Sequence, residues 1–223
     1  MTTQLLLYNE ALGYLGERQL ASLTEPREPR RVLDSYWLDV VGYCLGQGLW
    51  RFARRTVQQD ADSSLSPQFG FNYAFPYPSD WVRTQVVSTS PQLDPPLLQY
   101  RDEGNYIYAN ATPIYHSYIS ADPTYGMDIG AWPENFADYV ACRLARKACL
   151  RLTNDKDLYK EIKAGEDRAR RTAKSSDAMN DPPGLPPVPF WARARRGAFG
   201  PGGLWFGSYV GGGTRAAGPL GSL

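Results

Sequence analysis

Histidine is almost missing from this chain, since His116 is the only one among 223 residues. That scarcity excludes His-rich metal centres, HExxH proteases and most acid–base arrangements built on imidazole. Three cysteines occur, and no two of them have the CxxC spacing of a metal or redox site. We expect Cys44, Cys142 and Cys149 to be buried free thiols of a protein made in a reducing compartment. No metal and no cofactor is therefore expected.

Long apolar runs and charge of one sign are also lacking. No stretch of 18 apolar residues occurs, so we expect no membrane span and no membrane partner. The opening Met1–Gln4 lacks the basic region of a secretory signal. With 24 Lys and Arg against 23 Asp and Glu, the net charge of +1 excludes a strongly basic nucleic-acid packager and a strongly acidic nucleic-acid mimic. Phosphate-binding, dinucleotide-binding and serine-hydrolase motifs are absent.

Aromatic residues are abundant, with 15 Tyr, 6 Trp and 8 Phe. The length suits one ordinary domain or two small ones, and 43% hydrophobic residues suffice for a core. Some of the aromatic side chains fill that core. The others suit interfaces, where large rings are enriched.

Helical patterns occur at both ends of the first 180 residues. Apolar spacing predicts a helix over 5–15 with Gly16 as its C-cap, and a second helix from Pro29 to about Phe52. Pro133 opens a third helix with a stripe of small residues over 137–152. A last helix runs from about Leu158 to Met179. Residues 1–55 and 129–180 are thus predicted to form a bundle of about four helices.

Residues 56–128 carry eight prolines, which exclude a long helix. Four short runs rich in Val, Ile, Tyr and Thr predict strands, namely Trp81–Ser88, Leu97–Arg101, Tyr106–Ala109 and Ile114–Ser120. A tight hairpin turn is expected at Glu103-Gly104-Asn105, between the second and third of these strands. We expect one small antiparallel sheet of three or four strands inserted in the bundle, which gives an α+β, mainly α, fold.

Residues 181–223 have no periodicity, and 11 Gly and 7 Pro dominate them. Such a segment buries too little apolar surface to offset its ordering entropy alone. After the polyproline-like spacer Asp181–Pro189 it carries aromatic and basic residues suited to docking: Phe190, Trp191, Arg193, Arg195, Arg196, Phe199, Trp205 and Phe206. We expect an extended C-terminal arm that orders on a partner. A tail without a partner is the alternative.

Side chains that could support catalysis are few. Asp102 and Glu103 are the obvious carboxylate pair for a glycosidase, but neighbours in a strand point to opposite faces, and we interpret both as turn residues. His116 lies in a strand-like run and is expected to be an ordinary surface or core histidine. We expect no enzymatic activity.

Basic residues gather in two places. Arg51, Arg54 and Arg55 close the predicted second helix, and residues 141–174 hold 11 basic against 5 acidic side chains. Contact with phosphates or another anionic partner is one interpretation. A solvated helix face with internal ion pairs is the other.

Several spaced motifs resemble one family. The opening segment contributes Tyr8, Asn9, Leu12, Leu15 and Gly16; the run Gly48–Arg55 contributes Trp50, Phe52 and Ala53; the start of the third helix contributes Trp132, Pro133 and Phe136. Together with Tyr73–Trp81, these residues are similar to the head-to-tail adaptor, or connector, proteins of tailed bacteriophages. The podoviral form is called tail tubular protein A or the gatekeeper-ring protein. The resemblance covers roughly residues 5–175.

The resemblance implies a helical bundle with a β-rich insertion and no catalytic residues. It implies a homo-oligomeric ring, typically of twelve copies, that joins the portal protein to the tail nozzle or next neck protein. Such a ring surrounds the DNA channel used in ejection and contacts DNA non-specifically. It also implies synthesis in the bacterial host cytoplasm and a final place at the head–tail interface of the virion, with the arm docked on the portal. The end of the chain, 197–223, is longer and richer in Gly than expected for the family.

Two other functions are compatible with the sequence. One is a non-specific nucleic-acid-binding module that uses the basic helices and the arm. The other is a carboxylate-based cell-wall hydrolase.

Overall fold

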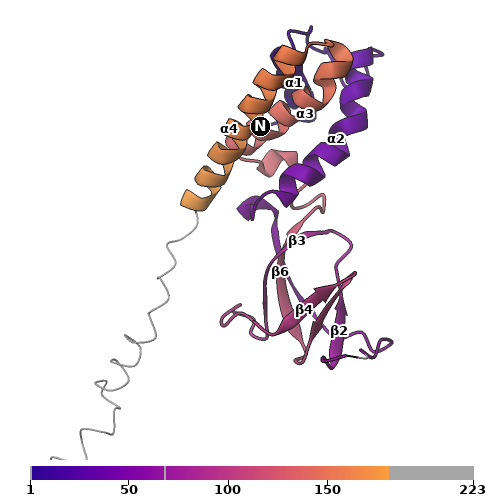
Figure 1. Ribbon diagram of the computed structural model, residues 1–223, viewed down its shortest axis with the longest axis vertical. Coiled ribbons are helices and arrows are strands. Elements are labelled where there is room, and N and C mark those ends of the chain that lie inside the picture. Colours follow the sequence, from indigo (N-terminus) through magenta and orange to yellow (C-terminus); the bar gives the residue numbers. More distant parts are fainter. Residues whose placement is uncertain (1, 68, 181–223) are drawn as a thin grey trace, which may run out of the picture. The chain divides into compact units, whose positions relative to one another are not determined.

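The computed structural model describes residues 2–67 and 69–180 (Figure 1). This part of the chain is α+β, as expected, with four helices, two 3₁₀ turns and six strands. In chain order they are α1 (Gln4–Tyr14), α2 (Glu28–Gly46), η1 (Arg51–Ala53), β1 (Arg54–Gln59), β2 (Tyr73–Pro76), β3 (Trp81–Ser88), β4 (Tyr100–Glu103), β5 (Tyr106–Ala109), β6 (Ile114–Ser120), η2 (Ile129–Ala131), α3 (Glu134–Leu152) and α4 (Lys156–Met179).

Helix α1 spans Gln4–Tyr14, one residue earlier at each end than predicted, and its C-cap is Leu15 in place of Gly16. The Thr3 side chain accepts a hydrogen bond from the backbone N–H of Leu6, which caps the start of the helix. Gly16 follows the end with a φ of +70°, a conformation that favours glycine. Leu7, Tyr8 and Leu12 are completely buried on one side of the helix, which therefore packs against the bundle.

Helix α2 ends at Gly46, six residues earlier than the predicted Phe52. The indole Nε1 of Trp50 donates a hydrogen bond of 2.9 Å to the carbonyl oxygen of Cys44 in the last turn of α2. A Cβ at Gly48 would lie 2.8 Å from the indole of Trp50, so only glycine lets the chain fold back so closely. The prediction was wrong because this turn depends on a tryptophan that lies beyond the helix.

Helix α3 lies at the centre of the bundle, in contact with α1, α2 and α4 (Figure 1). Its predicted stripe of small residues is confirmed as buried, including Ala141, Ala145 and Ala148. Small side chains let the backbones of neighbouring helices approach closely. Helix α4 follows after Asp155, whose carboxylate accepts hydrogen bonds from the first turn and caps it.

The strands form two antiparallel three-stranded sheets, where the sequence predicted one. Their orders are β1-β6-β3 and β2-β5-β4. Strands β1 and β2 were not predicted, and the strand expected at Leu97–Arg101 starts at Tyr100 and continues to Glu103. The hairpin between β4 and β5 is confirmed, with Gly104 at a φ of +64°.

Two hydrophobic cores stabilise these elements. The larger one is formed by the helices and includes Ile119 of β6, so the bundle and the first sheet share it. The smaller one contains Phe75, Val87, Ile107, Ala109 and Ile114, which come from both sheets. Within the described ranges, no helix combines the length and the apolar character needed to cross a bilayer.

Candidate interaction surfaces

The residues that carry the resemblance meet in an aromatic cluster. Phe136 at the start of α3 contacts three rings, with centroid distances of 4.8 Å to Trp50, 4.8 Å to Phe52 and 5.1 Å to Trp132. The indole of Trp132 donates a hydrogen bond of 2.9 Å to the carbonyl oxygen of Gly126. Residues from the segment that follows α2 and from the start of α3 thus form one packed unit.

The motif residues of the first helix also have structural contacts. Tyr8 is buried, and its hydroxyl donates to Asp34 of α2 at 2.9 Å. The Asn9 side chain accepts from the Leu20 N–H at 2.7 Å and donates to the Leu20 carbonyl at 3.1 Å, which fixes the loop after α1. The remaining motif residues are core or capping residues: Leu12, Leu15, Ala53, Gly16 and Pro133. The motif set therefore defines the fold and leaves the interaction surfaces to other residues.

The predicted docking arm lies outside the described residues. This holds for each of its named positions, Phe190, Trp191, Arg193, Arg195, Arg196, Phe199, Trp205 and Phe206.

Asp102 and Glu103 do not form a catalytic pair. Both belong to β4, so the interpretation as turn residues was wrong, because the hairpin turn is confined to Gly104-Asn105. Asp102 pairs with Ile107, and Glu103 pairs with Tyr106, so the two carboxylates face opposite sides of the sheet. In the described ranges, no group of three or more His, Cys, Asp or Glu side chains could hold a metal ion.

His116 is a buried core residue of β6. Its Nε2 lies 3.0 Å from the hydroxyl of Thr84, and its Nδ1 has no hydrogen-bond partner within the described part of the chain. Burial lowers the pKa of His116 to about 4. The imidazole is therefore neutral at physiological pH and enclosed by protein, which does not suit a general base.

The three cysteines are buried and free, as expected. Cys142 and Cys149 lie on the buried side of α3, and burial raises the pKa of Cys44 to about 12. Burial shields all three thiols from solvent.

The basic cluster expected at the end of the second helix lies instead in η1 and β1. Arg55 forms ion pairs with Asp80 at 2.9 Å and with Asp122 at 3.7 Å. These contacts tie β1 to the residues flanking β3 and β6. Arg55 is therefore engaged within the protein, and Arg51 and Arg54 also have interactions of their own.

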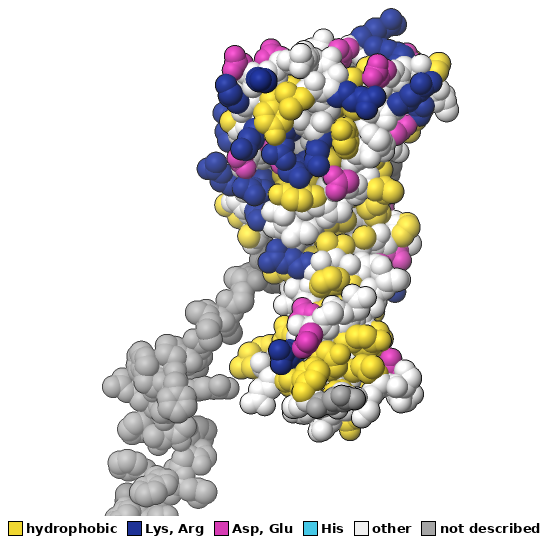
Figure 2. Space-filling view, turned by 45° about the vertical axis from the view of Figure 1, so that its right-hand side comes forward, with side chains coloured by type: hydrophobic (Ala, Val, Ile, Leu, Met, Phe, Trp, Pro, Cys, Tyr) yellow, Lys and Arg dark blue, Asp and Glu magenta, His cyan; other side chains and the backbone are white. Residues whose placement is uncertain are grey.

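The basic residues of α3 and α4 are gathered over the helices in Figure 2. The most buried ion pairs link the two helices, since Glu166 contacts Arg143 at 2.8 Å and Arg146 at 2.7 Å. Six of the eleven basic side chains of 141–174 form ion pairs, namely Arg143, Arg146, Lys147, Arg151, Lys160 and Arg170. The interpretation as a helix face with internal ion pairs accounts for about half of this basic segment.

One hollow brings Lys174, a basic residue of this segment, together with Arg83. It has a volume of about 360 Å³, and its walls include Arg83 of β3 and Lys174 of α4 together with Asp177. Partial burial, followed by the positive charges of Arg170 and Arg83, lowers the pKa of Lys174 from its usual value. An anion bound in this hollow would reduce the repulsion between Lys174 and Arg83.

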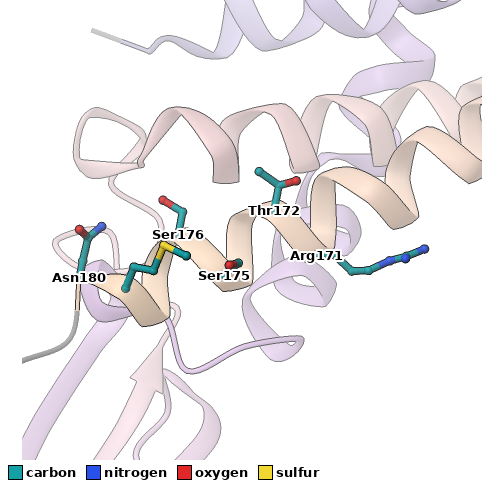
Figure 3. A pocket seen from close by; sticks show the side chains of 6 residues that line it. Arg171, Thr172, Ser175, Ser176 and Asn180 are labelled. Atoms are coloured by element: carbon teal, nitrogen blue, oxygen red, sulfur yellow. The ribbon is translucent and has the colours of Figure 1, made fainter. Parts of the chain in front are cut away.

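The hollow drawn in Figure 3 does not resemble a substrate site. All six of its lining residues, from Arg171 to Asn180, belong to α4 or follow directly after it. Their side chains do not converge on a common point, and Arg171 and Asn180 lie at opposite ends (Figure 3).

An apolar surface lies on the second sheet, where sequence reasoning had predicted only strands. Tyr106 and Tyr108 are half-buried on one face of β5, and their rings are 6.2 Å apart. Phe69 packs on Tyr108 at 5.1 Å, and the guanidinium of Arg101 lies 5.5 Å from the Phe69 ring. We call these four residues the tyrosine surface. Figure 2 shows hydrophobic side chains gathered over the strands.

Neither a scan against models of known protein families nor a search of curated proteins gave a match to this chain.

Proposed function

We propose that this chain is a structural subunit of the neck of a tailed bacteriophage. Copies form a ring beneath the portal, join the DNA-filled head to the tail nozzle or next neck protein, and surround the DNA channel. The protein acts in the virion, at the head–tail interface, after synthesis in the cytoplasm of the bacterial host. It has no catalytic role.

One observation carries this proposal. The motif residues that resemble the adaptor family are far apart in the sequence, yet Trp50, Phe52, Trp132 and Phe136 lie in one aromatic cluster. Residues that together define a core are a stronger basis for a family resemblance than unrelated surface positions, because a core constrains the fold.

The described residues also offer the two unlike faces that a ring requires. A closed ring of identical subunits uses heterologous contacts, in which one surface of a copy binds a different surface of the next. The tyrosine surface is aromatic, and the exposed part of α3 and α4 is rich in cations. Aromatic side chains and arginine are enriched in such interfaces.

The arm is assigned to the portal in this proposal. Among the described residues, the buried residues of the large core lie between Leu7 and Ala173, and a chain truncated after Asn180 keeps them. We expect the truncated protein to fold with an unchanged helical circular-dichroism spectrum and to lose attachment to portal rings. If the truncated protein attaches to portal rings as well as the full chain does, the arm is not what binds the portal.

The virion provides the direct test of function. Mass spectrometry of purified particles should find the protein in a fixed ratio to the portal, and particles made without it should lose DNA or lack tails. Normal infectious particles without the protein would refute the proposal. Reproducible peptidoglycan cleavage that is lost in Glu103→Gln would instead favour the hydrolase.

A nucleic-acid-binding module is the second candidate, because Arg83 and Lys174 line one hollow. Phosphate contacts would make DNA affinity fall steeply with salt. Tight, sequence-selective binding by the isolated chain at physiological salt would favour this candidate over the adaptor.

A further inference from the structure

The outer face of α1 carries large apolar side chains that are partly exposed to solvent. Leu6 is 54% exposed and Tyr14 is 41% exposed. Glu10 and Gly13 lie between them on the same face, at spacings of four and seven residues from Leu6. A Cβ at Gly13 would meet nothing within 4 Å, so the surface above it is open.

Two hollows border this face and share Leu6 and Glu10. The first, of about 530 Å³, continues along α1 past Gly13 and Tyr14 to Gln19. The second, of about 570 Å³, extends to η2 and the start of α3 and is lined there by Trp132, Glu134, Ala137 and Asp138. We call the two hollows together the α1 groove. Its lining combines the apolar side chains of Leu6, Trp132 and Ala137 with carboxylates.

The charged side chains in the α1 groove are all acidic. Glu10, Glu134 and Asp138 line it, and no Lys or Arg of the described residues forms an ion pair with any of them. Burial and the neighbouring Asp138 raise the pKa of Glu10 to about 7. Repulsion between these carboxylates is relieved when a bound partner supplies positive charge. The groove therefore suits a segment with apolar and cationic side chains.

The chain itself contains a segment of this composition. Phe190 and Trp191 are followed by Arg193, Arg195 and Arg196, and the only acidic residue of 181–223 is Asp181. Residues 182–189, which hold five prolines, separate this segment from the end of α4 in the sequence.

We propose that the α1 groove of one copy binds residues 190–196 of a neighbouring copy. The aromatic rings cover Leu6 and Tyr14, and the arginines pair with the carboxylates of Glu10, Glu134 and Asp138. The contact is heterologous and links subunits in series. This inference rests on the proposed function, because a ring places copies of the chain next to one another. It leaves Phe199, Trp205 and Phe206 of the arm to contact the portal.

Disulfide trapping in the full chain tests this contact, because the three native thiols are buried. Leu6→Cys and Trp191→Cys are made separately, one of them with a size tag, and the two proteins are mixed under mild oxidation. We expect tagged–untagged heterodimers to form about ten times faster than with the control Leu150→Cys, whose side chain is 48% exposed on α3. Equal rates would overturn the proposal.

The double variant Leu6→Cys/Trp191→Cys identifies the copy that supplies the arm. A ladder of cross-linked oligomers supports binding between copies. A cross-linked monomer at every concentration would overturn it, since the groove would then hold the arm of its own chain.

Charge substitutions test the recognition itself. Glu10→Gln combined with Asp138→Asn should slow heterodimer formation several-fold, and Asp157→Asn, on the exposed side of α4, should not. If heterodimers form at the same rate with the unsubstituted groove, with the double variant and with Asp157→Asn, the carboxylates do not recognise the arginines. None of these measurements involves the portal. If these measurements contradict the contact but the chain still assembles on portal rings, only the binding of the arm to the α1 groove is refuted. If the chain does not assemble on portal rings, the proposed function is refuted instead.

Discussion

The ring of Phe136 meets the indole of Trp50 edge-on, with 4.8 Å between the ring centroids and 65° between their planes. This contact joins the first turn of α3 to the segment that leaves α2. The same indole caps the end of α2 through its bond to the Cys44 carbonyl. One pair of residues thus fixes both the end of a helix and the point where the chain enters the strands.

Phe136→Ala should therefore destabilise the whole described domain. Removing a buried phenylalanine costs about 3–5 kcal/mol, and Phe136 is 1% exposed. Chemical denaturation measures the change in the free energy of unfolding. Leu150→Ala on the exposed side of α3 is the control and should change it little. A similar, small change for both variants would contradict the central position of the cluster.

The ion pairs of Glu166 predict a second large effect. Glu166 is 5% exposed and lies between Arg143 and Arg146, and the guanidinium of Arg143 also packs over the Tyr43 ring at 3.5 Å from its centroid. Glu166→Gln leaves Arg143 buried without its counter-charge, which costs about 3 kcal/mol.

The matched control for Glu166 is Asp157→Asn. Asp157 pairs with Lys160, and both side chains are well exposed, so this change should have almost no effect on thermal unfolding. If the two variants unfold at the same temperature, the link between α3 and α4 does not depend on Glu166.

The helices could be predicted well from the sequence because their signals are local. The small residues of α3 repeat at helical spacing, and Gly16 and Asp155 mark helix ends through their own backbone and side-chain preferences. The end of α2 could not be predicted, because it depends on a hydrogen bond from Trp50 back to Cys44.

The division into two sheets was missed for a related reason. β1 pairs with β6 across most of the insertion, with Arg54 opposite Ile119, and no local pattern encodes that pairing. Leu6 and Tyr14 were within a correctly predicted helix, yet their exposure depends on which side of α1 packs against α3. The α1 groove and the tyrosine surface therefore required the three-dimensional structure.

We expect the contribution of Glu10 to the stability of the folded protein to fall as the pH rises. Its pKa is raised from 4.5 to about 7 in the folded protein, so between these values the folded state keeps a proton that the unfolded state has lost. The contribution of Glu10 to the free energy of unfolding thus decreases from pH 4.5 to 7 and is constant above. Glu10→Gln should match the parent protein at pH 4 and be more stable at pH 8. A stability difference that does not grow with pH would contradict this assignment.

His116 makes a contribution to the free energy of unfolding that changes with pH in the opposite direction. Its titration can be observed separately from that of the other groups. Its pKa falls from 6.5 to about 4 on folding, so the unfolded state binds the extra proton and the contribution to stability is lost as pH falls from 6.5 to 4. Because it is the only histidine, its imidazole gives one unambiguous NMR signal. The signal should be constant from pH 8 to 5.5 and titrate near pH 4. A midpoint near 6.5 would mean that His116 is exposed.

The central claim is that this chain is a ring subunit that assembles on a portal. Size-exclusion chromatography with light scattering, with and without the portal protein of the same phage, measures this directly. We predict that the chain, whether monomeric or not by itself, joins the portal peak with a mass equal to a ring of twelve copies on each portal ring. A chain that elutes separately from the portal at every concentration and ratio would contradict the account.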